Sequence, residues 1–135
     1  MIQVIMGLKG SGKTKRLINS INEAVASAQG DVVCIEYGKQ LTYDINYRVR
    51  LVDSKEYDID NLDKLKGLLS GLHAGNFDIT NVYIDNLYKT IGADRANGEA
   101  FILWAAAFAE AHNMNITVTV SDDPAGASEE IKKYL

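Results

Sequence analysis

The sequence predicts an α/β fold of three layers, in which a mostly parallel sheet of about five strands lies between helices on both of its faces. Two observations predict this fold. Short apolar runs that fit strands alternate along the chain with longer segments whose apolar residues recur at helical spacing. Several of the strand-like runs are apolar throughout, which is typical of a parallel sheet covered on both sides. The 135 residues fit one domain, 1–135.

The first predicted strand, Ile2–Met6, leads into a glycine-rich loop and then into a helix over Lys13–Ala28. The loop, Gly7–Thr14, fits the pattern G-x-x-x-x-G-K-[ST] at every fixed position. Its glycines let the backbone bend tightly and aim N–H groups at a phosphate, and the start of the helix adds a partial positive charge. We expect Lys13 to be exposed in the empty loop and to reach the β- and γ-phosphates. The hydroxyl of Thr14 suits a Mg²⁺ ion.

The expected phosphate-binding residues are the loop and the position after it: Gly7, Leu8, Lys9, Gly10, Ser11, Gly12, Lys13, Thr14 and Lys15. The alternative interpretation is a glycine-rich turn that joins strand to helix and binds no ligand. That alternative leaves unexplained why Lys13 and Thr14 follow the third glycine.

The next predicted elements are a buried strand at Val32–Ile35, which stops at Glu36, and a short strand at Tyr47–Val52. The first of these completes a right-handed β-α-β unit. The second alternates in character, so we expect it at an edge of the sheet. The acid-rich segment 53–63 is interpreted as a surface loop, and it leads into a helix of about Asn61–Leu72 with leucines on one face.

The last part of the chain predicts a strand at Asn81–Asn86, a helix at Ala96–His112, a strand at Ile116–Ser121 and a short helix from Ser128. The helix that contains Trp104 is apolar nearly all the way round. Such a helix is either sandwiched inside the protein or half used by a partner. A homo-oligomer or a protein partner that binds through this helix is therefore one of two interpretations.

The composition is that of a soluble globular domain, with 47% apolar and 24% charged residues. A net charge of −4 argues against broad nucleic-acid binding, so nucleic acid is not indicated as a partner. The single cysteine, Cys34, is expected to be a small buried hydrophobic residue, which fits a cytoplasmic setting. No segment fits a secretion signal or a membrane span, so we expect no membrane insertion.

The loop Gly7–Thr14 resembles the Walker A motif of the P-loop nucleoside triphosphatases, and Val82–Asp85 resembles a Walker B strand. An acid at the carboxyl end of a buried parallel strand lies where an open α/β sheet forms its ligand crevice. The resemblance implies ATP, or another nucleoside triphosphate, bound with Mg²⁺ that Thr14 and Asp85 hold. The structural alternative for Asp85 is an acid that begins a turn.

The resemblance also implies catalytic roles for Lys13, Glu36, Asp85 and Ser121. Many members of the additional-strand class have a glutamate directly after the Walker B aspartate, whereas this chain has Asn86, which cannot accept a proton. RecA-type ATPases have a small polar residue there and take their base from the end of the strand after the P-loop helix. Glu36 is similar to that base, although a strand-end acid exposed to solvent is equally compatible. Ser121 resembles the polar sensor of this class, or it simply opens a turn.

The order of elements is also similar to that of type II thymidine kinases. Those enzymes have a glutamate after the Walker B aspartate and a cysteine zinc lasso after the final strand, whereas this chain has Asn86, one cysteine and a short tail. The residues Gly10–Thr14 are likewise similar to the loop of twitching-motility and secretion ATPases, whose further sequence boxes have no counterpart here.

Other side chains remain open at this stage. The arginines outside the first helix, any of which could act as a finger in cis or on a neighbouring subunit, are Arg48, Arg50 and Arg95. The two histidines, His73 and His112, are expected to be far apart, at helix ends or on the surface. The tyrosines that could stack on a base or merely pack are Tyr37, Tyr43 and Tyr88.

The expected function is that of a RecA-like P-loop protein that binds ATP and Mg²⁺ and acts as a slow or partner-stimulated ATPase. One alternative is a nucleotide-binding regulatory module without turnover, which Asn86 and the short tail favour. Another is a small nucleoside or small-molecule kinase, which would need a lid that the sequence does not indicate. The sequence favours adenine only weakly, because a guanine-specific N/T-K-x-D signature is missing.

Overall fold

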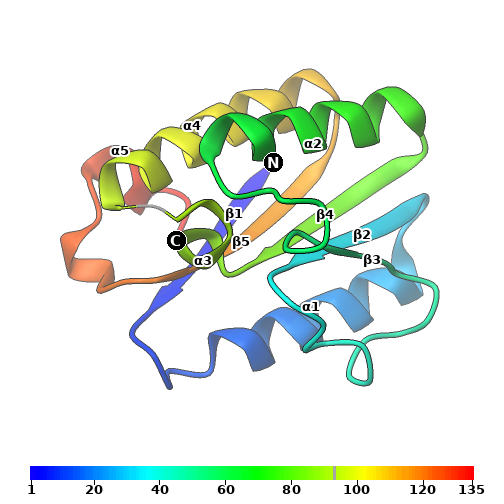
Figure 1. Cartoon of the computed structure of the whole chain (residues 1–135), viewed down its shortest axis with the longest axis horizontal. Coiled ribbons are helices and arrows are strands. Elements are labelled where there is room, and N and C mark those ends of the chain that lie inside the picture. The colour runs from blue at the N-terminus through cyan, green and yellow to red at the C-terminus, as the bar shows by residue number, and fades with distance from the viewer. Residues whose placement is uncertain (93) are drawn as a thin grey trace.

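The computed structural model describes residues 1–92 and 94–135 and has the predicted three-layer α/β architecture (Figure 1). The strands are β1 (Ile2–Gly7), β2 (Asp31–Glu36), β3 (Arg50–Asp53), β4 (Ile79–Asp85) and β5 (Asn115–Ser121). The helices are α1 (Lys13–Ser27), α2 (Leu62–Gly75), α3 (Leu87–Ile91), α4 (Arg95–Ala111), the 3₁₀ helix η1 (Pro124–Gly126) and α5 (Glu129–Lys132). None of these helices has the length and apolar character needed to cross a membrane.

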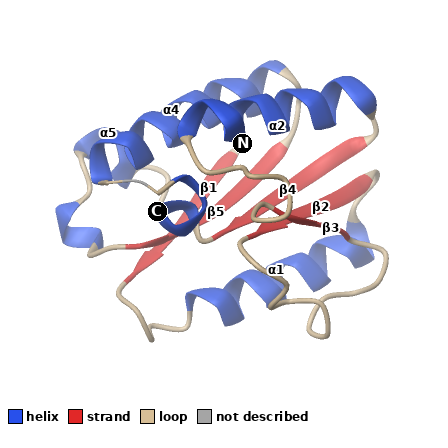
Figure 2. Ribbon diagram, viewed as in Figure 1, coloured by secondary structure: helices blue, strands red, loops and turns tan. Residues whose placement is uncertain are grey.

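The five strands form one sheet in the order β1-β5-β4-β2-β3, and every pair of neighbours is parallel. The chain crosses from β1 to β2 in one direction and returns from β3 through β4 to β5 in the other. Right-handed crossovers in opposite directions put their helices on opposite faces of a sheet. Accordingly α1 covers one face, while α2 and α4 cover the other (Figure 2). This reversal opens a crevice at the carboxyl ends of β1, β5 and β4.

Both faces of the sheet are packed with apolar side chains. In β2, Val33 and Ile35 belong to the cluster under α2 and α4, whereas Cys34 belongs to the cluster under α1. The two-sided burial explains why this strand is apolar at successive positions. Cys34 is fully buried as predicted, and this burial, together with the charges of Glu36 and Asp85, raises the pKa of its thiol.

The edge strand β3 begins at Arg50 and not at Tyr47 as predicted. The segment before it packs as a loop instead, because Leu41, Ile45 and Val49 bury their side chains in the cluster under α1. Asn22 of α1 fixes this loop, since its side chain donates to the carbonyl of Asp44 and accepts from the amide of Asn46. The prediction of an edge position is confirmed.

The sequence did not predict α3, which follows β4 directly. It is a helix of five residues, Leu87–Ile91, and it buries Leu87, Thr90 and Ile91. A helix shorter than two turns shows too little periodicity to be recognised from its sequence alone.

The apolar helix α4 is covered by the sheet and by α2, which lies beside it (Figure 1). Trp104 is half-buried, stacks on Phe108 with ring centroids 4.9 Å apart, and lies under the Lys66 ammonium of α2 at 5.7 Å. Leu103 is 37% exposed on the outer side. Because α4 is buried on two sides, most of the apolar residues around its circumference are covered within the protein. Self-association through this helix stays a prediction.

The two histidines are not far apart, contrary to the prediction. The rings of His73 and His112 lie 4.1 Å apart between centroids. Both residues do lie at helix ends, His73 in the last turn of α2 and His112 at the end of α4. They meet because α2 and α4 run side by side, which the spacing of the two residues along the chain does not reveal.

Candidate functional site

The glycine-rich loop joins β1 to α1 at the crevice. Gly10 and Gly12 have φ angles of 85° and 87°, a left-handed conformation that other residues rarely adopt. Gly12 is the residue before the first turn of α1, so the loop delivers its backbone directly to the N-terminus of that helix. The free N–H groups of such a terminus and its partial positive charge favour an anion.

Lys13 is buried at 9% exposure, so the expectation of an exposed lysine is wrong. Its flexible side chain folds back over the loop, and its Nζ donates to the carbonyl oxygen of Leu8 at 3.1 Å. This hydrogen bond holds the ammonium group against the loop, beside the start of α1.

A pocket of about 380 Å³ lies at the carboxyl ends of β4 and β5, beside the loop and the start of α1. Its lining residues are Lys9, Gly10, Gly12, Lys13, Thr14, Lys15, Asp85, Asn86, Thr119 and Ser121. The predicted residues Lys13, Thr14, Asp85 and Ser121 therefore come together, although they belong to separate parts of the chain. Gly7, Leu8 and Ser11 belong to the loop without lining the pocket, and Glu36 does not line it either.

Two hydrogen bonds order the wall of the pocket opposite the loop. Thr119 donates through Oγ1 to Asp85 Oδ1 at 2.8 Å, and Asn86 donates through Nδ2 to Ser121 Oγ at 3.1 Å. The Oδ1 atom of Asn86 is buried and has no hydrogen-bond partner among the described residues. These contacts orient the carboxylate of Asp85 and tie the end of β4 to the end of β5.

Thr119 is a pocket residue that sequence reasoning missed. The signal was the alternation along β5, in which Thr117, Thr119 and Ser121 are polar and the residues between them are apolar. Alternate residues of a strand share one face. The choice of Ser121 as a site residue therefore implied that Thr119, two residues earlier in β5, lies on the same face of the sheet.

Glu36 is 3% exposed, so the alternative of a solvent-exposed acid is wrong. Its Oε1 accepts hydrogen bonds from the backbone amides of Gln40 at 2.6 Å and Leu41 at 3.1 Å. The carboxylate thereby anchors the loop that follows β2. Glu36 pairs in register with Asp85 on the neighbouring strand, but its role as a catalytic base stays a prediction.

No arginine is among the pocket-lining residues that the structure describes. Arg50 begins β3, so it and the nearby Arg48 lie toward the opposite edge of the sheet from the pocket. Arg95 is already bound, because its guanidinium group contacts Asp122 and the carbonyl of Gly126. None of the three is arranged as a finger within this subunit.

The three tyrosines proposed for base stacking also lie outside the lining of the pocket. Tyr43 is almost completely exposed, and Tyr37 packs beneath the ammonium group of Lys55. Tyr88 donates its hydroxyl to Asp122 Oδ2 at 3.0 Å. Burial, and the contact with Asp122, raise the pKa of Tyr88 to about 12.

The pocket offers oxygen ligands of the kind that Mg²⁺ prefers. The hydroxyl of Thr14 and the carboxylate of Asp85 line the same space, and both are hard donors. Within residues 1–92 and 94–135, no group of three or more His, Cys, Asp or Glu could hold a metal ion. Mg²⁺ in phosphate-transfer sites is characteristically held by one or two protein groups together with substrate phosphates. The residues present fit that mode of binding.

Comparisons with known proteins do not assign the chain to a family. No protein-family model matches the chain, and a search of curated proteins finds no match. The functional argument therefore depends on the pocket itself.

Proposed function

We propose that this protein binds a nucleoside triphosphate, with ATP as the leading ligand, together with Mg²⁺, and hydrolyses it slowly or when a partner stimulates it. One observation carries the proposal: Lys13 and Thr14 at the start of α1 line the same pocket as Asp85 at the end of β4. A phosphate-binding loop and a strand-end carboxylate are the minimum needed to hold a triphosphate and its metal ion.

The charges of the pocket suit this ligand. Lys9, Lys13 and Lys15 line it from the loop side, and Asp85 is the single acid among the lining residues that the structure describes. In the proposed complex the phosphates lie against the start of α1, where backbone N–H groups and Lys13 contact them. Mg²⁺ would offset charge on the phosphate oxygens. Thr14 and Asp85 are the residues that would hold it.

The rate is expected to be low without a partner. Asn86, which follows Asp85, can hydrogen-bond to water but cannot take its proton. The described pocket lining also holds no arginine that could stabilise charge developing in the transition state. A partner that contributes an arginine or a base would raise the rate. Asn86 also favours a second candidate, a binding module without turnover, because the pocket position directly after Asp85 carries an amide in place of a base.

Replacement of Asp85 by Asn tests the metal role. Asparagine keeps the size of the side chain and an oxygen that can accept from Thr119, so the pocket should keep its shape. We expect affinity for ATP to fall roughly 10-fold with Mg²⁺ present and to change less than about 3-fold without it, because the lost charge acts on the ion. Calorimetric titration with and without magnesium measures both values.

The matched control is Asp53→Asn, which changes another strand-end aspartate outside the pocket lining. The Asp53 side chain accepts hydrogen bonds from the amides of Gly38 and Lys55. Loss of its negative charge should not alter the dependence of ATP affinity on magnesium. Equal losses for Asp85→Asn with and without the ion would mean that Asp85 is structural.

A second prediction concerns the base. The described lining consists of glycine, lysine, threonine, aspartate, asparagine and serine, with no aromatic or aliphatic side chain. Nucleobases are selected mainly by stacking and by shaped apolar walls with a few polar groups. We therefore expect ATP, GTP, CTP and inorganic tripolyphosphate to compete with affinities within about 10-fold of one another. Competition titrations measure this, and a preference for ATP beyond 100-fold would show that a base site exists elsewhere.

A further inference from the structure

We propose that Arg95 is a positioning residue for the pocket: acting through Asp122 and Tyr88, it fixes Ser121 and Asn86 in the wall that would face the terminal phosphate. The statement about the terminal phosphate rests on the proposed function. The contacts of Arg95, Asp122 and Tyr88 are observed in the structure and do not depend on that function.

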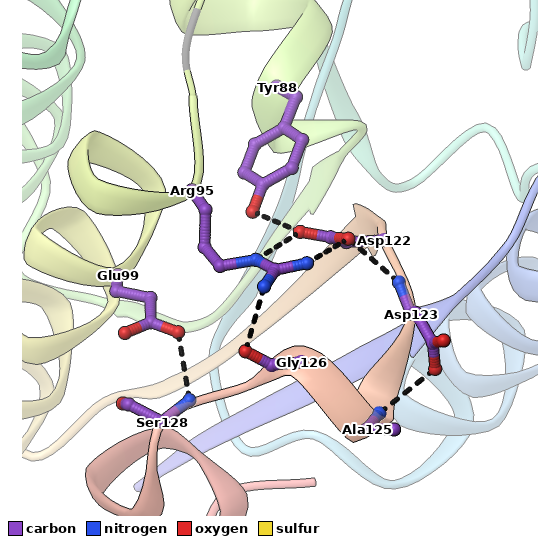
Figure 3. A network of polar contacts seen from close by, with 8 residues as sticks. All are labelled: Tyr88, Arg95, Glu99, Asp122, Asp123, Ala125, Gly126 and Ser128. Carbon is purple, nitrogen blue, oxygen red and sulfur yellow. Dashed lines mark hydrogen bonds and ion pairs between the residues drawn. The ribbon is translucent and has the colours of Figure 1, made fainter.

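Arg95 holds Asp122 with both arms of its guanidinium group (Figure 3). Its Nε donates to Oδ2 at 2.9 Å and its Nη2 donates to Oδ1 at 2.7 Å, which is the bidentate geometry of a strong charge-assisted pair. Its Nη1 donates to the carbonyl of Gly126 at 3.0 Å. Tyr88 adds a fourth bond, from its hydroxyl to Asp122 Oδ2. We call Tyr88, Arg95, Asp122 and Gly126 the Arg95 network.

The Arg95 network continues directly into the pocket. Asp122 is the residue after Ser121, and Tyr88 comes two residues after Asn86. Inside the pocket Asn86 bonds to Ser121, and outside it Tyr88 bonds to Asp122. The segments that leave β4 and β5 are thus joined twice. The amide of Asp122 also donates to the carbonyl of Gly7, which links the same point to the strand before the loop.

The Arg95 side chain is 49% exposed, about as much as the Lys64 side chain, so what distinguishes the Arg95 network from an ordinary surface ion pair is the close approach of two glycines to it. A Cβ atom at Gly98 of α4 would collide with the ring of Tyr88, and one at Gly126 would lie 2.5 Å from Arg95 Nη1. Both positions therefore need glycine for the network to close. Exposed ion pairs usually contribute little to stability, and the pair between Lys64 of α2 and Asp60, just before that helix, is an example here. The bidentate pair between Arg95 and Asp122 instead fixes the orientation of the Asp122 carboxylate relative to the guanidinium group, because two parallel hydrogen bonds join the two groups.

The segment after Asp122 is held by further contacts of the same region (Figure 3). The side chain of Asp123 accepts from the amide of Ala125, and Glu99 of α4 accepts from the amide of Ser128. Together with the bond from Arg95 to Gly126, these contacts fasten the chain from Ser121 onward to α4. Loss of the Arg95 side chain would leave the Asp122 carboxylate with the hydroxyl of Tyr88 as its remaining contact from α3 and α4, and we expect the neighbouring Ser121 to be less precisely placed in the pocket.

The charge state of the network has a consequence at low pH. Hydrogen bonding from Arg95 lowers the pKa of Asp122 to about 2, below its ordinary value of 3.8. A carboxylate with a lowered pKa stabilises the folded state above its ordinary pKa, and this contribution is lost as the pH falls through the folded value. The network therefore stays intact at neutral pH, where the test below is made.

The test compares Arg95→Gln, Arg95→Lys and Tyr88→Phe with the wild-type chain at neutral pH. The first readout needs no ligand: the side-chain amide resonance of Asn86 in an ¹⁵N correlation spectrum, identified by its loss in Asn86→Ala. The second is the affinity for ATP and ADP with Mg²⁺, measured by calorimetry. Lys64→Gln, which breaks the exposed pair with Asp60, is the matched control.

We expect Arg95→Gln to shift the Asn86 resonance and to weaken ATP roughly 10-fold, because small misplacements of contact groups are costly. ADP should change less than about 2-fold, since it lacks the terminal phosphate. Arg95→Lys keeps the positive charge but cannot form the bidentate pair, so it should not restore the wild-type Asn86 resonance or ATP affinity. Tyr88→Phe keeps the packing against Gly98 and should give a smaller shift in the same direction. Lys64→Gln should change neither readout.

An unshifted Asn86 resonance in folded Arg95→Gln or Tyr88→Phe overturns the inference, whatever the chain binds. Equal losses of ATP and ADP affinity in Arg95→Gln overturn it as well, because they indicate a general loosening. If the wild-type chain binds no triphosphate, the proposed function fails, and the Asn86 resonance still decides whether Arg95 positions the wall.

Discussion

Replacing Lys13 by alanine is expected to weaken the binding of ATP with Mg²⁺ by at least ~100-fold while the fold stays intact. Lys13 is 9% exposed, and its Nζ already lies across the loop, where it bonds to the carbonyl of Leu8. In a desolvated position a charge-assisted contact to phosphate is strong, and truncating one partner of such a pair costs about 2–5 kcal/mol. The contact that Lys13 loses in the free protein lies within the loop, so thermal stability should change little.

Lys15→Ala is the matched control for this prediction. Lys15 lines the same pocket and carries the same charge, but its side chain is exposed to solvent. An exposed charge is screened, so its loss should weaken ATP by less than about 10-fold. Calorimetry measures affinity and circular dichroism checks the fold. Unchanged affinity in folded Lys13→Ala, or equal effects of both variants, would contradict the assignment of the loop as a phosphate site.

The fold was predictable because its signals are local. The long strands are rich in apolar residues, and a run that is apolar at successive positions, such as Val32–Ile35, indicates burial on both faces. The start of α1 follows from Gly12 and Lys13, which stand at the junction of loop and helix. The short α3 and the late start of β3 were missed, because five residues carry little periodicity and because packing against α1 decides the shape of the loop before β3.

The site was predictable only where a single segment defines it. The loop residues and Asp85 stand in recognisable patterns, whereas the bond from Thr119 to Asp85 joins residues on two strands whose register the sequence does not give. The pair of Arg95 and Asp122 is likewise set by where α4 begins relative to the end of β5. The burial of Lys13 depends on how a flexible side chain folds over its own loop. Such contacts follow from tertiary packing and not from spacing.

Glu36 was expected from the sequence to be a base or an exposed strand-end acid, and the structure adds a third interpretation, an anchor for the loop after β2. As a base it would need to reach water in the pocket, yet it does not line the pocket and is 3% exposed. As an anchor it holds the amides of Gln40 and Leu41, and Leu41 is itself buried under α1. The geometry of these bonds favours the anchor.

Two substitutions at Glu36 decide between these roles. Glu36→Gln keeps an oxygen that can accept from both amides but cannot act as a base, and Glu36→Ala removes the acceptor altogether. If Glu36 is an anchor, we expect the glutamine variant to keep its hydrolysis rate within about 3-fold. The alanine variant should lose about 2–4 kcal/mol of unfolding free energy, because it leaves two amides without their partner.

A base would give a different pattern, since both variants would lose about 10²–10⁴-fold in rate whatever their stability. Phosphate release under saturating ATP and denaturant unfolding measure the two quantities on the same samples. A large loss of rate in fully stable Glu36→Gln would contradict the anchor and restore the RecA-like base. If the wild-type chain releases no phosphate while it binds ATP, unfolding alone tests the anchor, and the binding module becomes the better description of the function.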